Sequence, residues 1–356
     1  MVITIVDLLV PADVHLGPLL VVAPALTASF AGARLTASIG ALAVGAQVFI
    51  GVHFGVLPTR NVMVQVFSLA ILSALIVFFC RVREHRRLEL AKVRSVAETA
   101  QKALLRPLPH RIGPLRITSL YLAAEDEAEI GGDLYTATGT DDGVRMIIGD
   151  VRGHGLSAVG ESAQLLGAFR VVADQHATLP ALACALDRSV SRYLTDFVDA
   201  EDGIGEHFIT ALLLEIPNDG RMTRMTCCGH PPPLLLHERH VRTLTSAHPA
   251  PPLGVAALSA AQFPVEEFAF DAGDTLILHT DGVTEARDEN GVFYPLAQRV
   301  EQWAKNRPEA LLDHLRRDLL AHCQGHLCDD AAVIAIQRTP APPGGPALTG
   351  PPAKGP

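Results

Sequence analysis

The sequence lacks several features that would assign it to common classes of protein. Positive charge is not in excess, since 38 Asp and Glu residues outnumber 29 Lys and Arg residues and the net charge is −9. A nucleic-acid-binding protein needs a basic surface, so we expect no nucleic acid among its partners. No basic stretch precedes the first apolar run, which argues against a cleaved signal peptide. No internal repeat is visible.

Cysteine is also scarce, and no two cysteines form a CxxC pair. A chain of 356 residues can bury a core without cross-links, so we expect free thiols in a reducing cytoplasm. The adjacent Cys227 and Cys228 allow two interpretations, a redox-active pair or two small residues of a strand.

An apolar N-terminal region is the first feature that is present. Mean hydropathy is +0.26, and the apolar excess lies in the first eighty residues. Residues 62–80 and 35–56 carry no formal charge and are long enough to cross a bilayer. Residues 16–33 are a weaker candidate, because Pro18 and Pro24 interrupt them. We predict a transmembrane region over residues 1–80 with about three helices, or two if the weakest candidate fails.

Basic residues directly follow the last apolar run, at Arg81, Arg83, Arg86 and Arg87. Positive charge beside a membrane span marks its cytoplasmic end. We therefore expect a multi-pass protein of the cell membrane, in contact with lipid, whose C-terminal part lies in the cytoplasm. Gly51 and Gly55 form a GxxxG pattern, which either packs helices together or reflects the frequency of glycine in such spans.

A charged helical linker is predicted over residues 81–109. Its apolar residues are spaced three and four apart, at Leu90, Val93, Ala97, Ala100 and Leu104. This spacing is typical of a coiled-coil seam, which would make a homodimer. The alternative is one amphipathic helix packed on its own domain. Pro107 and Pro109 end the helix.

The rest of the chain alternates strand-like and helix-like runs between residues 110 and 338. Apolar runs predict strands at residues 116–124, 144–151, 208–216, 231–237, 274–282 and 331–337. Helical patterns cover residues 155–175 and 307–323. Residues 339–356 are rich in Pro, Gly and Ala, which predicts a disordered tail.

Aspartates lie at the ends of several of these apolar runs, namely Asp133, Asp150, Asp281 and the pair Asp329 and Asp330. If the strands are neighbours, the carboxylates meet at one rim, where mutual repulsion and burial raise their pKa values. Sites made of oxygen ligands suit Mg²⁺ or Mn²⁺, and two such ions can activate water and neutralise a phosphoryl group. The pattern thus favours metal-assisted phosphoester hydrolysis, although a single Asp-Gly pair is also an ordinary turn.

Six ordered motifs carry a family resemblance. They read "EIGGDLY", "GDVRGHGLSA", "FITALLLEI", "CCGHPPPLLL", "GDTLILHTDGVTEARDENGVFY" and "CDDAAVIAI". Together they resemble the PPM-type metal-dependent serine/threonine phosphatases, in the bacterial branch named for stage II sporulation protein E. The likeness covers about residues 95–338. It implies an α+β fold, an α-β-β-α sandwich of two antiparallel sheets with two metal ions at one edge. It also implies a hydrolase of phosphoserine or phosphothreonine that uses metal-activated water.

The resemblance also implies roles for particular residues. Asp133 falls on the first metal aspartate, and Asp150 on the aspartate that bridges both ions, with the Val151 carbonyl as a further ligand. Asp281 falls on the aspartate of the TDG motif. Asp329 falls on the first acid of the last motif, and its neighbour Asp330 is a less certain ligand. Asp133, Asp150, Asp281 and Asp329 are thus the expected catalytic set, and no other cofactor is expected.

Some positions depart from the family pattern. Thr136 stands where an Asp is frequent, and Cys227-Cys228 where Asn-Ala is usual; His230 is expected to be structural. Arg152 and His154 flank the expected metal site. One interpretation is that they bind phosphate or act as a catalytic acid. The other is that they have no such role and that the loop requires only the flanking glycines for its turn.

The sequence therefore favours a membrane-anchored phosphatase in bacterial signal transduction. By resemblance its substrate is a phosphorylated regulator of the anti-anti-sigma type, and the segment "QKALLRPLP" passes signals to the catalytic centre. Three alternatives stay open: a catalytically silent membrane signalling module of the same fold, a nucleotide cyclase built on GGD, and a transporter. Leu134-Tyr135 stands where a cyclase has an acidic pair, and the apolar spans show no ion path.

Overall fold

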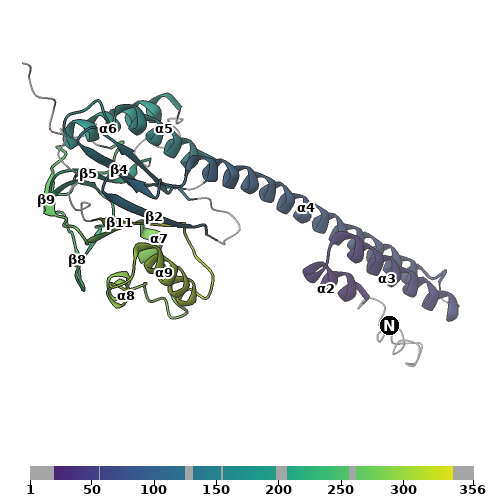
Figure 1. Cartoon of the computed structure of the whole chain (residues 1–356). Coiled ribbons are helices and arrows are strands. Elements are labelled where there is room, and N and C mark those ends of the chain that lie inside the picture. Colours follow the sequence, from purple (N-terminus) through teal and green to yellow (C-terminus); the bar gives the residue numbers. More distant parts are fainter. Residues whose placement is uncertain are drawn as a thin grey trace, which may run out of the picture. The chain divides into compact units, whose positions relative to one another are not determined.

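The computed structural model describes residues 20–55, 57–124, 131–153, 155–197, 207–255 and 262–339. The chain forms two compact units, Met1–Val93 and Arg94–Pro356. Figure 1 shows the helices of the first unit and the two sheets of the second. Apart from Thr339, the tail that we predicted to be disordered lies outside the described residues.

The N-terminal unit is helical. It contains α2 (Val22–Phe30), α3 (Ala33–His53) and the first part of α4 (Arg60–Leu104). Two stretches, Ala33–His53 and Arg60–Lys92, are long and apolar enough to cross a membrane by length and composition. The predicted span at residues 16–33 is described only from residue 20 onward, where the nine residues of α2 are too few to cross. The described residues therefore hold two candidate spans, the smaller of the numbers we predicted.

Helix α4 also includes residues 81–104 of the predicted linker. It runs without interruption to Leu104, ahead of Pro107 and Pro109. Leu90 is exposed on it, but the side chains of residues 93–98 and 100 lie outside the described set. The helix is thus as expected, while the seam and the homodimer stay predictions.

The C-terminal unit contains two antiparallel sheets. The six-stranded sheet has the order β1-β2-β11-β10-β7-β8, and the five-stranded sheet has the order β3-β4-β5-β6-β9. The first is formed by β1 (Arg111–Ile112), β2 (Leu115–Leu122), β11 (Ala331–Arg338), β10 (Thr275–His279), β7 (Leu234–His237) and β8 (His240–Thr243). The second is formed by β3 (Leu134–Gly139), β4 (Gly143–Val151), β5 (Ile209–Pro217), β6 (Met222–Cys228) and β9 (Glu266–Ala269).

Helices cover the outer face of each sheet (Figure 1). On the five-stranded sheet lie α5 (Leu156–Val172) and α6 (Leu179–Phe197), and on the six-stranded sheet lie α8 (Leu296–Gln302) and α9 (Pro308–His322). The short α7 (Asp281–Thr284) follows β10. This is the α-β-β-α sandwich that the family resemblance implied.

The central strands are apolar on both faces because each is covered on both sides. In β4, Met146 and Ile148 belong to the core between the sheets, and Ile147 belongs to the core under α5 and α6. In β11, Ile334 packs between the sheets and Val333 packs under α9. Successive side chains of a strand point to opposite faces, so a strand in the middle of four layers reads as one continuous apolar run.

Candidate active site

The predicted aspartates come from both sheets and meet at one edge of the sandwich. Asp133 directly precedes β3, and Asp150 is the penultimate residue of β4. Asp281 begins α7, one residue after β10, and Asp329 lies just before β11. A hydrogen bond joins the two sheets here, because Thr280 Oγ1 donates to Asp133 Oδ2 at 3.0 Å.

The glycines next to these aspartates allow backbone segments to touch. A Cβ atom on Gly132 would lie 2.5 Å from the Val151 carbonyl oxygen, and one on Gly282 would lie 2.0 Å from the Asp330 carbonyl oxygen. Real Cβ atoms do not approach oxygen so closely, so no larger residue fits without a shift of the backbone. The Gly-Asp pairs are therefore positions of close packing that bring the carboxylates together.

Burial and neighbouring carboxylates raise the pKa values of two aspartates at this edge. Burial is the main cause that raises the pKa of Asp133 well above its usual value, and Asp150, Asp330 and Asp329 add to it. Burial likewise raises the pKa of Asp150 to about 8, with Asp281 and Asp329 adding to it. Both effects disfavour the charged carboxylates, and a bound cation would reverse them.

The donor set fits a hard divalent cation by its chemistry, since it consists of carboxylate oxygens and backbone carbonyls. Across the described ranges, however, no three His, Cys, Asp or Glu side chains lie close enough together to hold an ion. The carboxylates are thus within electrostatic reach of one another without forming one closed shell.

The two adjacent aspartates of the last motif have different surroundings. Asp330 is buried, and its carboxylate accepts hydrogen bonds from Gln101 Nε2 at 3.0 Å, Ala124 N at 2.8 Å, Gly131 N at 3.1 Å and the Tyr121 hydroxyl. Asp329 is exposed. Asp330 therefore joins α4, β2 and the segment before Asp133, whereas Asp329 faces solvent.

Sequence reasoning missed three of these residues: Gln101, Tyr121 and Thr280. Two of them carried a signal. Gln101 is the first residue of the "QKALLRPLP" segment, and Thr280 directly precedes Asp281. Tyr121 lies in β2, and nothing in the sequence indicates that its hydroxyl meets Asp330.

The remaining candidates lie around this edge. His230 is buried with Nδ1 3.2 Å from Thr210 Oγ1, and burial, followed by the neighbouring His279, lowers its pKa to about 3. The imidazole is therefore neutral, which agrees with the structural role expected for His230. Arg152 is exposed just after β4. His154 lies outside the described residues, so its role stays a prediction.

The cysteines are free thiols, as predicted. Cys227 and Cys228 end β6, and burial is the main cause that raises the pKa of both thiols. A raised pKa leaves little reactive thiolate, which favours the structural interpretation of this pair.

Comparison with known proteins agrees with this architecture. The family model described as "Stage II sporulation protein E (SpoIIE)" matches residues 140–339. Protein IcfG of Synechocystis sp. is 26% identical over 281 residues, which cover 71% of this chain and 42% of that protein. Phosphoserine phosphatase RsbP of Bacillus subtilis is 26% identical over 252 residues, covering 70% and 57%. The chain thus spans about half the length of these relatives.

Two solved structures share the fold. The RsbU and RsbW domains of Rv1364c from Mycobacterium tuberculosis align with a TM-score of 0.53 and 27% identity, over 64% of this chain and 61% of that chain. The SiaA-PP2C domain of Pseudomonas aeruginosa aligns with a TM-score of 0.51 and 16% identity, over 72% and 96%. Since the family model covers more than half of the sequence and the two-sheet fold agrees, this chain belongs to the stage II sporulation protein E family of PPM-type serine/threonine phosphatases.

Proposed function

We propose that the chain is a metal-dependent protein serine/threonine phosphatase anchored in a membrane. The observation that carries the proposal is that Asp133, Asp150, Asp281 and Asp329, from the strand ends of two different sheets, lie within electrostatic reach of one another. Burial, and after it the neighbouring carboxylates, raises the pKa of Asp133 and Asp150, and a bound cation would offset both effects by stabilising the charged carboxylates. Similarity to a phosphoserine phosphatase supports the same reaction.

In this proposal Asp133, Asp150, Asp281 and Asp329, with the Val151 carbonyl, hold two Mn²⁺ or Mg²⁺ ions. When bound, such ions activate water and neutralise the charge of a phosphoryl group. Thr280 keeps Asp133 in place through its hydroxyl. We assign Asp330 to positioning instead of ligation, because four donors already engage its two oxygens.

The proposed substrate is phosphoserine or phosphothreonine in a bacterial regulatory protein. RsbP is named a phosphoserine phosphatase, and the similar mycobacterial structure contains an RsbU domain together with an RsbW domain. A regulator of the anti-anti-sigma type is the substrate that the family resemblance implies.

The proposed location is the cell membrane, with the phosphatase unit in the cytoplasm. Two apolar helices support the anchor, and four arginines after the second support the orientation. We also propose that α4 dimerises through its apolar seam and passes a signal to the site, which Gln101 contacts through Asp330. Replacing Leu90 and Ala97 with Glu should then change activity. Unchanged activity and an unchanged association state would remove this part of the proposal.

Hydrolysis tests the central proposal. The full-length protein in lipid would be given a phosphoserine peptide and p-nitrophenyl phosphate, with Mn²⁺ or with EDTA. We expect turnover that needs the metal and that Asp150→Asn abolishes. Asp141→Asn is the matched control, because Asp141 is an exposed aspartate in the turn between β3 and β4. Well-folded, metal-loaded protein without turnover would favour the silent signalling module.

A further inference from the structure

One exposed arginine lies directly beside the acidic edge. The Arg152 backbone N donates to the Phe208 carbonyl oxygen at 3.0 Å. This bond continues the register of β4 and β5, in which Asp150 lies opposite Thr210 and Val151 opposite Ile209. Arg152 lies at the bend that directly follows β4, two residues beyond Asp150.

The guanidinium of Arg152 packs on an aromatic ring but has no ion-pair partner among the described residues. Its Cζ atom lies 5.1 Å from the centroid of the Phe208 ring, which is a cation–π contact. Stacking uses the face of the guanidinium and leaves the N–H donors at its edge available. Within the described parts of the chain, no carboxylate forms an ion pair with Arg152.

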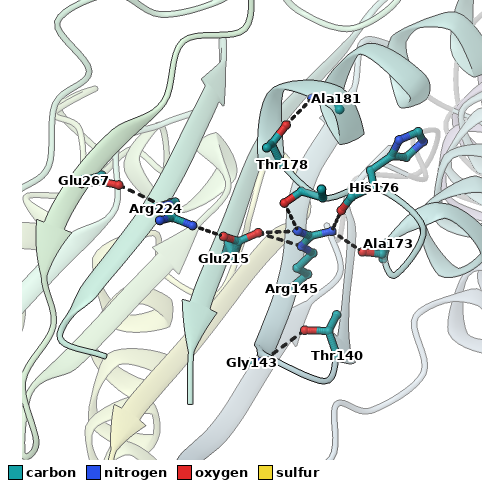
Figure 2. Close-up of polar contacts among 11 residues, drawn as sticks. Thr140, Gly143, Arg145, Ala173, His176, Thr178, Ala181, Glu215, Arg224 and Glu267 are labelled. Atoms are coloured by element: carbon teal, nitrogen blue, oxygen red, sulfur yellow. Dashed lines mark hydrogen bonds and ion pairs between the residues drawn. The ribbon is translucent and has the colours of Figure 1, made fainter. Parts of the chain in front are cut away.

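Other arginines of the same sheet show the contrast (Figure 2). Arg145 and Arg224 lie at the opposite end of β4 to β6, in a row of ion pairs with Glu215 and Glu267. The carboxylates of Glu215 and Glu267 thus compensate the positive charges of these two arginines. Arg152 differs from them because it lies two residues beyond Asp150 and forms no ion pair with a described carboxylate, so its N–H donors can reach a ligand.

A phosphoryl group approaching this edge meets several carboxylates, which repel it unless positive charge is nearby. A guanidinium can donate two parallel hydrogen bonds to phosphoryl oxygens. We propose that Arg152 contacts the phosphoryl oxygens of the substrate and that Phe208 holds its guanidinium for this contact. The inference rests on the proposed phosphatase function and adds a substrate-binding residue to it.

Phosphate binding tests this contact without turnover. Calorimetry would measure the affinity of Mn²⁺-loaded, full-length protein for inorganic phosphate, and steady-state assays would give KM for p-nitrophenyl phosphate and a phosphoserine peptide. For Arg152→Ala we expect phosphate binding to weaken, and both KM values to rise, by about tenfold or more. Arg152→Lys should be intermediate because it keeps the charge and loses the two-pronged contact. Phe208→Leu should show a loss of about two- to fivefold.

Arg224→Ala is the control, as an arginine of the same sheet at its far end. It should leave phosphate affinity and both KM values unchanged. Unaltered phosphate binding by Arg152→Ala would overturn the inference, and so would a KM change confined to the peptide, because that would place Arg152 against the protein part of the substrate. If Arg152→Ala does not fold, Arg152→Gln decides in the same assays. Wild-type protein that binds phosphate through Arg152 but does not turn over would sink the phosphatase proposal alone.

Discussion

Gln101 and Asp330 are 229 residues apart in sequence, and the Gln101 Nε2 donates to Asp330 Oδ2 at 3.0 Å. The same amide donates to the Gly131 carbonyl oxygen at 3.0 Å. Both side chains are buried. One amide thus joins the end of α4 to the segment before Asp133 and to the segment before β11, which are two sides of the acidic edge.

Gln101→Leu should lower the stability of the phosphatase unit. It leaves a buried carboxylate and a buried carbonyl without one donor each, and the loss of a hydrogen bond to a charged group costs about 1.5–3 kcal/mol. Thermal denaturation would then show Tm lower by roughly 3–12 °C. Gln164→Leu is the control, because Gln164 is exposed on α5. Equal Tm values for the two variants would show that the contact carries no stability.

Gly282→Ala should be strongly destabilising. The added Cβ would lie 2.0 Å from the Asp330 carbonyl oxygen, so α7 or the start of β11 must move. We expect a loss of about 3 kcal/mol or more in the free energy of unfolding, measured by denaturant titration. Gly167→Ala is the control, since open space surrounds that position in α5 and Ala should gain up to about 1 kcal/mol. Matching stabilities for the two variants would contradict the close approach at α7.

Arg145→Met should loosen the end of α5. Arg145 is almost fully buried and donates to Glu215 and to the carbonyl oxygens of Ala173, His176 and Ala177 (Figure 2). Losing one partner of a buried ion pair costs about 3–5 kcal/mol. Denaturant unfolding would measure this loss, and hydrogen exchange should quicken around residues 173–177.

The paired change Arg145→Met with Glu215→Met separates the ion pair from the carbonyl contacts. We expect the double variant to recover part of the loss, since the partly buried Glu215 carboxylate is then no longer left facing an apolar side chain. A double variant that loses the sum of the two single losses would show that the two side chains act independently.

His237→Gln should change how stability depends on pH. His237 Nδ1 lies 2.7 Å from Asp274 Oδ1, and this contact raises the pKa of the exposed imidazole. The folded state thus binds the proton more tightly than the unfolded state, so the contribution is full below about pH 6.5 and is lost as pH rises through the raised pKa. Tm should differ between wild type and His237→Gln at pH 5.5 and converge near pH 9. A constant difference across this range would rule out the charged pair as its cause.

Much of the fold could be predicted because its signals are local. The apolar runs at residues 144–151, 208–216 and 331–337 became β4, β5 and β11, strands covered on both faces. Helix α6 was missed, although Leu182, Leu186, Val190 and Leu194 form a buried stripe along it. Strand β6 was also missed, because charged and polar residues interrupt its apolar pattern.

The candidate site could be predicted only in part, for the same reason. Glycines and aspartates at strand ends are visible in the sequence, and they predicted which carboxylates belong to the site. The sequence did not show that Asp330 is buried while Asp329 is exposed. Neighbouring residues of an extended chain point to opposite faces, so a shift of one residue would exchange the two environments.

The sequence by itself determined the two apolar helices, the long strands and the set of acids, because spacing and composition along a short stretch decide these. Only the tertiary structure decided that Gln101 meets Asp330, that Thr280 holds Asp133 and that Arg152 stacks on Phe208 beside Asp150. Each of these contacts joins distant segments or different strands. The first two form only when the two sheets pack face to face, and the third only when β4 and β5 pair in register.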